Sequence, residues 1–175
     1  MNEVLEAIAR RRSIRSFTKE EVADELIAQI VKAGLQAPSG KDLQDVIILV
    51  VRNEKIKEMF REANGRIAKT PEGFDNFFGA PVYLVVLAQK GWRNAKYDGA
   101  LAMGSMMLAA HSLGLGSCWI NRAYEEFELE EFQELLKQYA IPGEWEGVGH
   151  LIVGHINGEV PPAKKIREGR VYYLD

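Results

Sequence analysis

The sequence predicts an α+β or α/β sandwich built around a mixed sheet. Residues 46–51 and 82–88 are continuous aliphatic and β-branched runs, the composition expected of strands buried on both faces. Between such runs, the apolar residues recur at helical spacing. Strands interspersed with helices are typical of a sheet that packs against layers of helices. At 175 residues the chain is expected to form a single domain, residues 1–175.

Helices are expected where apolar residues repeat three and four positions apart. Residues 3–10 have this pattern and predict a short amphipathic helix. Thr18 and Glu21 have the form of a capping box, which predicts a helix from there to about Leu35, ended by the turn residues 38–40. Three further helices are predicted, at 53–63, 97–113 and 129–139.

The remaining segments are shorter strands, a loop and a polar tail. Strands are expected at 117–120 and 149–156, and the weakly patterned segment 64–79 is expected to be a loop or lid. The helix at 97–113 is apolar nearly all round, which favours a position in the core or at a dimer interface. Residues 171–174 have the composition of a strand, and such a tail can add to the sheet of a partner. A homodimer is the resulting hypothesis.

The composition argues against several classes of protein. With a net charge of −3, the chain lacks the basic excess of a general nucleic-acid binder. Its longest apolar runs fall far short of the ~20 residues of a membrane span, and its first residues lack the apolar region of a signal peptide. Cys118 is the only cysteine, so an internal disulfide cannot form. These features predict a cytoplasmic protein without membrane or nucleic-acid partners.

Several well-known motifs of catalysis and metal binding are absent from the chain. It has no P-loop, no dinucleotide-binding glycine pattern, no HExxH, no paired CxxC and no G-x-S-x-G elbow. The three histidines, His111, His150 and His155, lack the spacing of metal ligands. Ordinary core or surface histidines are the better interpretation, so zinc chemistry is not predicted.

Basic residues gather near both ends of the chain and predict a local anion site. On an extended segment, alternation places Arg11, Ser13 and Arg15 on one side and Arg12 and Ile14 on the other. Two guanidinium groups flanking a hydroxyl suit a phosphomonoester, because arginine forms charge-assisted, often bidentate bonds to phosphate. The alternative is that the arginines complement the dipole of the preceding helix. The second basic cluster consists of Lys164, Lys165, Arg167 and Arg170.

A second motif, QAPSGKDLQDVIILVV, places Ala-Pro-Ser-Gly shortly before a strand. With RRSIRSF upstream, it resembles the opening of the nitroreductase (flavin reductase-like) family, whose pattern runs R-R-S-[IV]-R-x-[FY], a helix, A-P-S-x-x-N-x-Q-P-W and a strand. FFGAPVYLVVLA, the helix DGALAMGSMMLAAHSLGLGSCWI and GHLIVGH are similar to later blocks of that family, in order. The resemblance spans roughly residues 5–175. Where the family commonly has Asn, Pro and Trp, this chain has Asp42, Asp45 and Val46, and it retains Gln44.

The resemblance implies a nitroreductase-like fold, an α+β three-layer α/β/α sandwich. Its central sheet would be mixed and mainly antiparallel, and its C-terminal strand can be swapped to the partner of a homodimer. The resemblance also implies an FMN-dependent oxidoreductase that uses NADH or NADPH to reduce small electron acceptors, such as nitroaromatics or quinones, by a ping-pong hydride mechanism. The flavin supplies the chemistry in such enzymes, so no side chain is assigned a catalytic role and no metal is implied.

The family's cofactor contacts carry over to positions in this chain. Arg11 and Ser13 would hold the FMN phosphate and ribityl end, and Arg15 would approach the pyrimidine edge. The segment 38–40 would contact the flavin of the partner subunit, and a backbone N–H near 121–122 would donate toward the flavin N5. The implied cofactor-binding residues are Arg11, Arg12, Ser13, Arg15, Pro38, Ser39, Gly40, Asp42, Gln44, Trp119, Ile120, Asn121, Lys164 and Lys165.

Three alternative functions remain open at this point. One is a flavoenzyme of the same fold with other reductive chemistry, such as reductive dehalogenation or flavin fragmentation. Another is a non-catalytic FMN-binding or regulatory module. The third is an α/β interaction domain with surface arginine clusters. Failure of the protein to bind added FMN would favour this alternative.

Overall fold

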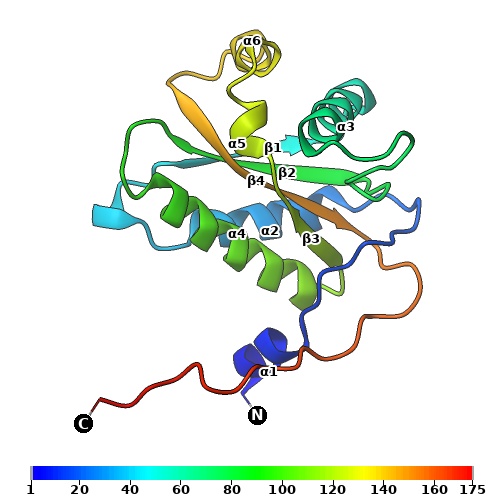
Figure 1. Ribbon diagram of the computed structural model, residues 1–175, viewed down its shortest axis with the longest axis vertical. Coiled ribbons are helices and arrows are strands. Elements are labelled where there is room, and N and C mark those ends of the chain that lie inside the picture. Colours follow the sequence, from blue (N-terminus) through cyan, green and yellow to red (C-terminus); the bar gives the residue numbers. More distant parts are fainter. Residues whose placement is uncertain (1, 175) are drawn as a thin grey trace.

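The computed structural model describes residues 2–174, which form a central sheet between two layers of helices (Figure 1). The strands lie in the order β1-β2-β4-β3, and every pairing between them is antiparallel. A single parallel bridge, between residues 13 and 117, adds a mixed element at the β3 edge. The predicted three-layer α+β architecture is confirmed. The strands are β1 (Val46–Val51), β2 (Val82–Gln89), β3 (Gly116–Ile120) and β4 (Trp145–Gly154).

Helices cover both faces of this sheet, as Figure 1 shows. One face carries α2 (Asp24–Leu35) and α4 (Ala95–Ser112), and the other carries α3 (Glu54–Ala68), α5 (Ala123–Glu126) and α6 (Glu130–Gln138). Helix α1 (Glu3–Arg10) lies apart from both layers and has no buried residue. A short 3-10 turn, η1 (Gly40–Asp42), precedes β1. No helix within residues 2–174 combines the length and apolar content that a bilayer span requires.

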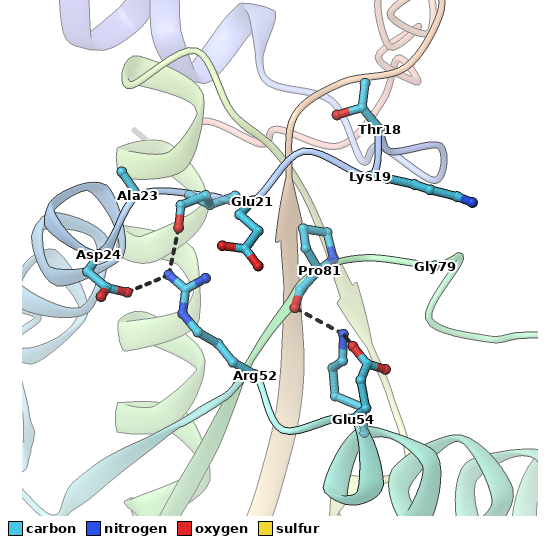
Figure 2. A pocket seen from close by; sticks show the side chains of 11 residues that line it. Thr18, Lys19, Glu21, Ala23, Asp24, Arg52, Glu54, Gly79 and Pro81 are labelled. Carbon is cyan, nitrogen blue, oxygen red and sulfur yellow. Dashed lines mark hydrogen bonds and ion pairs between the residues drawn. The ribbon is translucent and has the colours of Figure 1, made fainter.

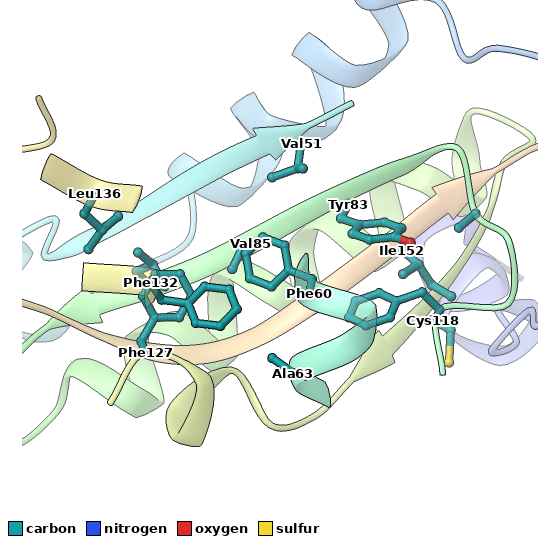
Figure 3. Close-up of a cluster of buried hydrophobic side chains, with 13 residues drawn as sticks. Val51, Phe60, Ala63, Tyr83, Val85, Cys118, Phe127, Phe132, Leu136 and Ile152 are labelled. Carbon is teal, nitrogen blue, oxygen red and sulfur yellow. The ribbon is translucent and has the colours of Figure 1, made fainter. Parts of the chain in front are cut away.

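Strand β2 is the centre of the core because both of its faces are covered. Val82, Leu84 and Val86 pack in the cluster beneath α2 and α4, whereas Tyr83 and Val85 pack in the cluster beneath α3 and α6. Each of these side chains is fully buried. Figure 3 shows the second cluster, in which aromatic rings from α3 and α6 meet the sheet. The continuous apolar composition of β2 therefore reflects burial on both faces.

Three predicted elements differ from the structure. Strand β1 was expected to be buried on both faces but is an edge strand, and Val50 is 47% exposed. Helix α2 begins at Asp24, not near Thr18, because the Thr18 hydroxyl accepts a bond from the Glu20 N–H (3.3 Å) while its backbone N–H pairs with a strand end. Residues 171–174 are exposed and have no strand partner within the described chain.

The segment 64–79 is only partly the predicted loop or lid, because its first five residues continue helix α3 to Ala68. Beyond the helix, Asp75 orders the turn that follows by accepting bonds from the N–H groups of Phe77 and Gly79, both at 2.7 Å. The segment is therefore a capped turn that leads into β2. The sequence pattern also did not indicate the short helix α5 or the 3-10 turn η1.

Helix α5 lies directly on β4 at a glycine. A Cβ atom at Gly147 would lie 2.0 Å from the Ala123 carbonyl oxygen. Only a residue without a side chain allows the backbone of α5 to approach the sheet this closely. The start of α5 also follows the end of β3, so this contact fixes the turn that joins the two elements.

We expect Gly147→Ala to destabilise the fold by about 1–3 kcal/mol, because α5 must move away from β4 to admit the methyl group. Gly65→Ala is the matched control. At that position, in helix α3, the added Cβ meets only the rotatable Thr70 hydroxyl at 3.2 Å, and alanine is the better helix former. Urea denaturation of both variants measures the difference. Equal stability of the two would contradict the close docking of α5.

Candidate functional site

The arginine-rich segment is held in extended form along the outer edge of β3. The Ile14 N–H donates to the Ser117 carbonyl and the Thr18 N–H to the His155 carbonyl, both at 3.0 Å. Ile14 is buried beneath this edge. Backbone pairing on both sides of residue 15 therefore fixes which way the intervening side chains point.

Ser13 and Arg15 share one side of this segment. Burial raises the pKa of the Cys118 thiol, and Arg15, the Ser13 hydroxyl and Arg11 each oppose that rise in turn. Ile14 between them is buried, so alternation along an extended segment places Ser13 and Arg15 on the face opposite Ile14. Nη1 of Arg11 is buried and has no hydrogen-bond acceptor among residues 2–174. A buried guanidinium nitrogen without an acceptor is costly, which makes this position a candidate for binding an anion.

A hollow of about 220 Å³, here called the β3-end pocket, opens beside these residues where β3 meets α5. The Arg15 guanidinium lies over one wall, 6.0 Å from the centre of the Phe78 ring. The Trp119 indole N–H is buried without an acceptor in the described chain, and its ring lies against Gly149. The pocket is lined by Arg15, Asn64, Ala68, Asn76, Phe78, Trp119, Ile120, Asn121 and Arg122.

The other half of the implied cofactor site lies in a different place. Pro38, Ser39 and Gln44 line a separate hollow of about 150 Å³ that shares no residue with the β3-end pocket. The loop is ordered by bonds from the Gly40 N–H to Asp98 Oδ2 (3.0 Å) and from the Gln44 N–H to Ser39 Oγ (2.9 Å). A single chain therefore does not bring the two halves together.

Backbone strain is concentrated in this loop. Lys41, Asp42 and Gln44 have φ values of 57°, 54° and 52°, the left-handed region that residues other than glycine rarely adopt. Asp42 is exposed, and its Oδ1 accepts a bond from the Gln44 amide at 3.4 Å. Strained, well-ordered loops of this kind cluster at binding sites.

The basic tail comes back toward the arginine-rich segment. Arg12 Nε donates to the Pro162 carbonyl at 2.8 Å, while its Nη1 donates to the Ala9 and Arg11 carbonyls. Lys164 and Lys165 follow Pro162 after one intervening residue, and both are exposed. The structure thus brings the tail close to the anion-binding candidate, although no contact from either lysine to the segment is formed.

A larger cavity, of about 610 Å³, lies elsewhere, and two of the cations that line it have partners (Figure 2). Arg52 pairs with Asp24 at 2.9 Å and donates to the Val22 carbonyl at 2.7 Å. Lys57 pairs with Glu54 at 2.6 Å, and its ammonium donates to the Pro81 carbonyl at 3.1 Å. Because Arg52 and Lys57, two of the cations that line it, are already paired, the β3-end pocket is the stronger functional candidate.

Sequence reasoning missed the buried polar groups behind the β3-end pocket. Asn64 is 2% exposed, and Glu126 and His150 are fully buried. The signal for Asn64 was its place on the core-facing stripe of α3, four residues after Phe60. No comparable signal marked Glu126, because its partners lie far away in the sequence. Within residues 2–174, no group of three or more His, Cys, Asp or Glu side chains is arranged to hold a metal ion.

The chain belongs to the nitroreductase family, whose model matches residues 8–155. It is 31% identical over 180 residues to an FMN reductase [NAD(P)H] of Bacillus subtilis, a match that covers 89% of this chain and 66% of that protein. FMN-bound nitroreductase structures from Bacteroides fragilis and Desulfitobacterium hafniense each superpose with a TM-score of 0.89 at 27% identity, over the full length of both chains. The family resemblance and the nitroreductase-like fold are thereby confirmed.

A buried carboxyl marks the end of the strained loop. Asp45 is 4% exposed, and neither of its side-chain oxygens receives a hydrogen bond from the described chain. Burial, followed by the nearby carboxylate of Asp98, raises the pKa of Asp45, and its own backbone amide partly opposes the rise. A raised pKa means that the folded chain holds this proton more tightly than the unfolded chain does. The stability that Asp45 contributes is therefore present below its unfolded pKa and lost as pH rises through its folded pKa.

We expect Asp45→Asn to melt about 2–4 °C higher than the parent protein near neutral pH, the shift that corresponds to a gain of ~1 kcal/mol in a chain of this size. The gain should shrink as pH falls below about 4, where the carboxyl becomes protonated in the unfolded chain as well as in the folded one. Thermal unfolding across this pH range measures it. Asp42→Asn is the control. This exposed position lies three residues before Asp45, and the melting temperature of the variant should show no such pH dependence.

Proposed function

We propose that this protein is an FMN-dependent oxidoreductase that uses NADH or NADPH to reduce small electron acceptors such as nitroaromatics or quinones. The observation that carries the proposal is the buried Nη1 of Arg11, which lacks an acceptor in the described chain and belongs to the same alternating set as Ser13 and Arg15. A phosphomonoester is the group that such a cluster suits. Membership of the nitroreductase family and similarity to FMN-bound relatives support the same conclusion.

In this proposal, each part of the segment has a separate role. Arg11 and Ser13 bind the phosphate end of FMN, and Arg12 holds the tail in place through Pro162. Arg15, at the β3-end pocket, stabilises negative charge on the ring, on the scale of ~3–4 kcal/mol for a well-placed donor. Residues 119–121 form the wall along which the ring lies. Bound FMN supplies hydride acceptance and donation, so no side chain need act as an acid or a base.

We further propose that the functional form is a homodimer in which the loop 38–44 completes the pocket of the partner. Helix α1 leaves Val4, Leu5 and Ile8 between 55% and 62% exposed, although their spacing is that of a packed helix face. An exposed apolar stripe of this kind is a typical contact surface for another protein chain. Within one chain, the loop 38–44 lies apart from the β3-end pocket. The two would meet if each cofactor binds between two chains.

The C-terminal residues fit the same dimer. Tyr172, Tyr173 and Leu174 are between 80% and 95% exposed. The outer edge of β1 has no strand partner within residues 2–174, whereas residues 13–17 already occupy the β3 edge. We infer that the tail of the partner adds a strand to β1. The single cysteine, which is buried, is consistent with a cytoplasmic location.

The purified protein should be yellow, and NADH or NADPH should bleach it until a quinone or nitroaromatic restores the colour. A protein that stays yellow with both donors would be an FMN-binding module and would contradict the enzymatic proposal. A colourless protein that ignores added FMN would contradict the cofactor itself. Absorbance spectra with each donor and acceptor separate these outcomes.

Arg11→Ala should weaken FMN binding about 10- to 100-fold, because it removes a charged donor in a buried position. Arg10→Ala is the matched control, since that side chain is 73% exposed and pairs with Glu6 on the surface. Fluorescence titration of each apoprotein with FMN measures both affinities. An equal effect of the two substitutions would indicate a loss of general positive charge and would count against a specific phosphate contact.

Sedimentation should give a particle of twice the 19.7 kDa mass of one chain. Replacing both Tyr172→Asp and Tyr173→Asp should shift it toward the single chain and release FMN, because charge at a strand-pairing surface opposes association. Glu168→Ala, an exposed change in the same tail, should leave the dimer intact. A single chain that retains its full complement of FMN would overturn the dimer proposal.

A further inference from the structure

The turn between β3 and α5 has a strained backbone at the wall of the β3-end pocket. Arg122 has φ 85° and ψ 0°, a left-handed conformation at a residue that is not glycine. Its side chain reaches outward to Glu125 at 2.9 Å, so it does not explain the conformation. Such strain persists only where surrounding contacts enforce it.

Asn64 supplies the enforcing contact from inside the protein. Its Nδ2 donates to the Asn121 carbonyl at 2.8 Å and to Glu126 Oε1 at 2.7 Å. Its Oδ1 accepts a bond from Asn76 Nδ2 at 2.8 Å. The amide is thus held on both sides, and it is only 2% exposed.

A buried contact between the Glu126 carboxyl group and the His150 imidazole lies behind Asn64. Glu126 Oε2 lies 2.6 Å from His150 Nε2, and both side chains are fully buried. The imidazole ring has edge contacts with Phe60 and Phe77, at centroid distances of 5.0 and 5.2 Å. Phe60 belongs to the aromatic cluster of Figure 3, so the pair is enclosed by rigid packing.

The direction of one peptide follows from these contacts. In a trans peptide the carbonyl and the next N–H point in opposite directions, and the described chain contains no cis bond. The Asn121 carbonyl points to Asn64, so the Arg122 N–H points away from Asn64, and both Asn121 and Arg122 line the β3-end pocket. No acceptor for this N–H exists among residues 2–174.

We propose that Asn64, braced by Glu126 and His150, is a positioning residue that directs the Arg122 N–H into the β3-end pocket and thereby sets the reduction potential of the flavin bound there. The inference rests on the proposed function. It adds three side chains outside the implied cofactor contacts, and it explains both the buried Glu126–His150 contact and the strain at Arg122.

The sign of the effect follows from flavin chemistry. In oxidised flavin the central ring nitrogen N5 is a hydrogen-bond acceptor, whereas in the reduced ring it carries a proton. A fixed N–H donor therefore favours the oxidised form. Freeing the Asn121–Arg122 peptide should remove that preference and raise the potential.

Asn64→Leu tests the inference because leucine has a similar volume but cannot bond to the Asn121 carbonyl. The variant should keep FMN bound, with a tenfold loss in the preference for oxidised over reduced flavin. For a two-electron couple this is about 30 mV toward positive potential. Equilibration with a reference dye measures the potential, and the FMN absorption spectrum should shift with it.

Phe132→Leu is the matched control for general destabilisation. It loosens the same aromatic cluster from helix α6 without touching the polar groups, so it should lower the melting temperature and leave the potential unchanged. His150→Leu and His150→Gln form a second test that does not depend on the folding of Asn64→Leu. His150→Leu removes the side chain that faces Glu126 and should raise the reduction potential of the flavin. His150→Gln keeps a hydrogen-bond donor at that position and should have the wild-type potential.

An unchanged potential in both Asn64→Leu and His150→Leu, in a protein whose wild type binds and turns over FMN, would overturn this inference alone. An equal shift in Phe132→Leu would also overturn it, because the effect would then follow packing. A wild type that binds no FMN would overturn the proposed function first, and this inference with it.

Discussion

Backbone pairing of residues 13–18, first with β3 and then with the segment that follows β4, is the constraint on which the site depends. The Ile14 N–H bonds to the Ser117 carbonyl, and the Asn157 N–H bonds back to the Ser16 carbonyl, each at 3.0 Å. Gly116 permits this approach, because a Cβ there would lie 2.9 Å from the Ile14 side chain. The same pairing places the arginines beside the β3-end pocket, covers one sheet edge and starts the C-terminal tail on its path past Arg12.

That constraint also explains why the site is divided. The arginine segment is fixed at one end of the sheet, whereas the 38–44 loop is fixed through Asp98 on α4. Three left-handed residues in that loop cost of order 1–3 kcal/mol each. A loop without a binding role would gain by relaxing, since few contacts within its own chain repay the strain. A second chain that uses the loop to complete its pocket accounts for both the strain and the separation.

Most elements could be predicted from the sequence, and the exceptions share a cause. Helix α1 and strand β1 have the predicted bounds, because local periodicity and composition determine them. The edge position of β1 could not be predicted, since an aliphatic run does not reveal how many strands will flank it. The capping box at Thr18 failed because Thr18 pairs with His155, far away in the chain. The bonds of Asn64, to residues 57 and 62 positions away, were likewise beyond local pattern.

The buried Glu126–His150 pair is difficult to explain by stability alone. Removing two polar groups from water is costly unless both are fully hydrogen-bonded, and aliphatic side chains would suit the surrounding aromatic cluster. A carboxylate, however, can only accept hydrogen bonds. Glu126 therefore requires the donor end of the Asn64 amide to face it, and that same nitrogen must then serve the Asn121 carbonyl. An apolar core could fill this space equally well, but it could not determine which way the amide points. The polar pair thus converts packing in the sheet into a fixed donor direction at the pocket wall.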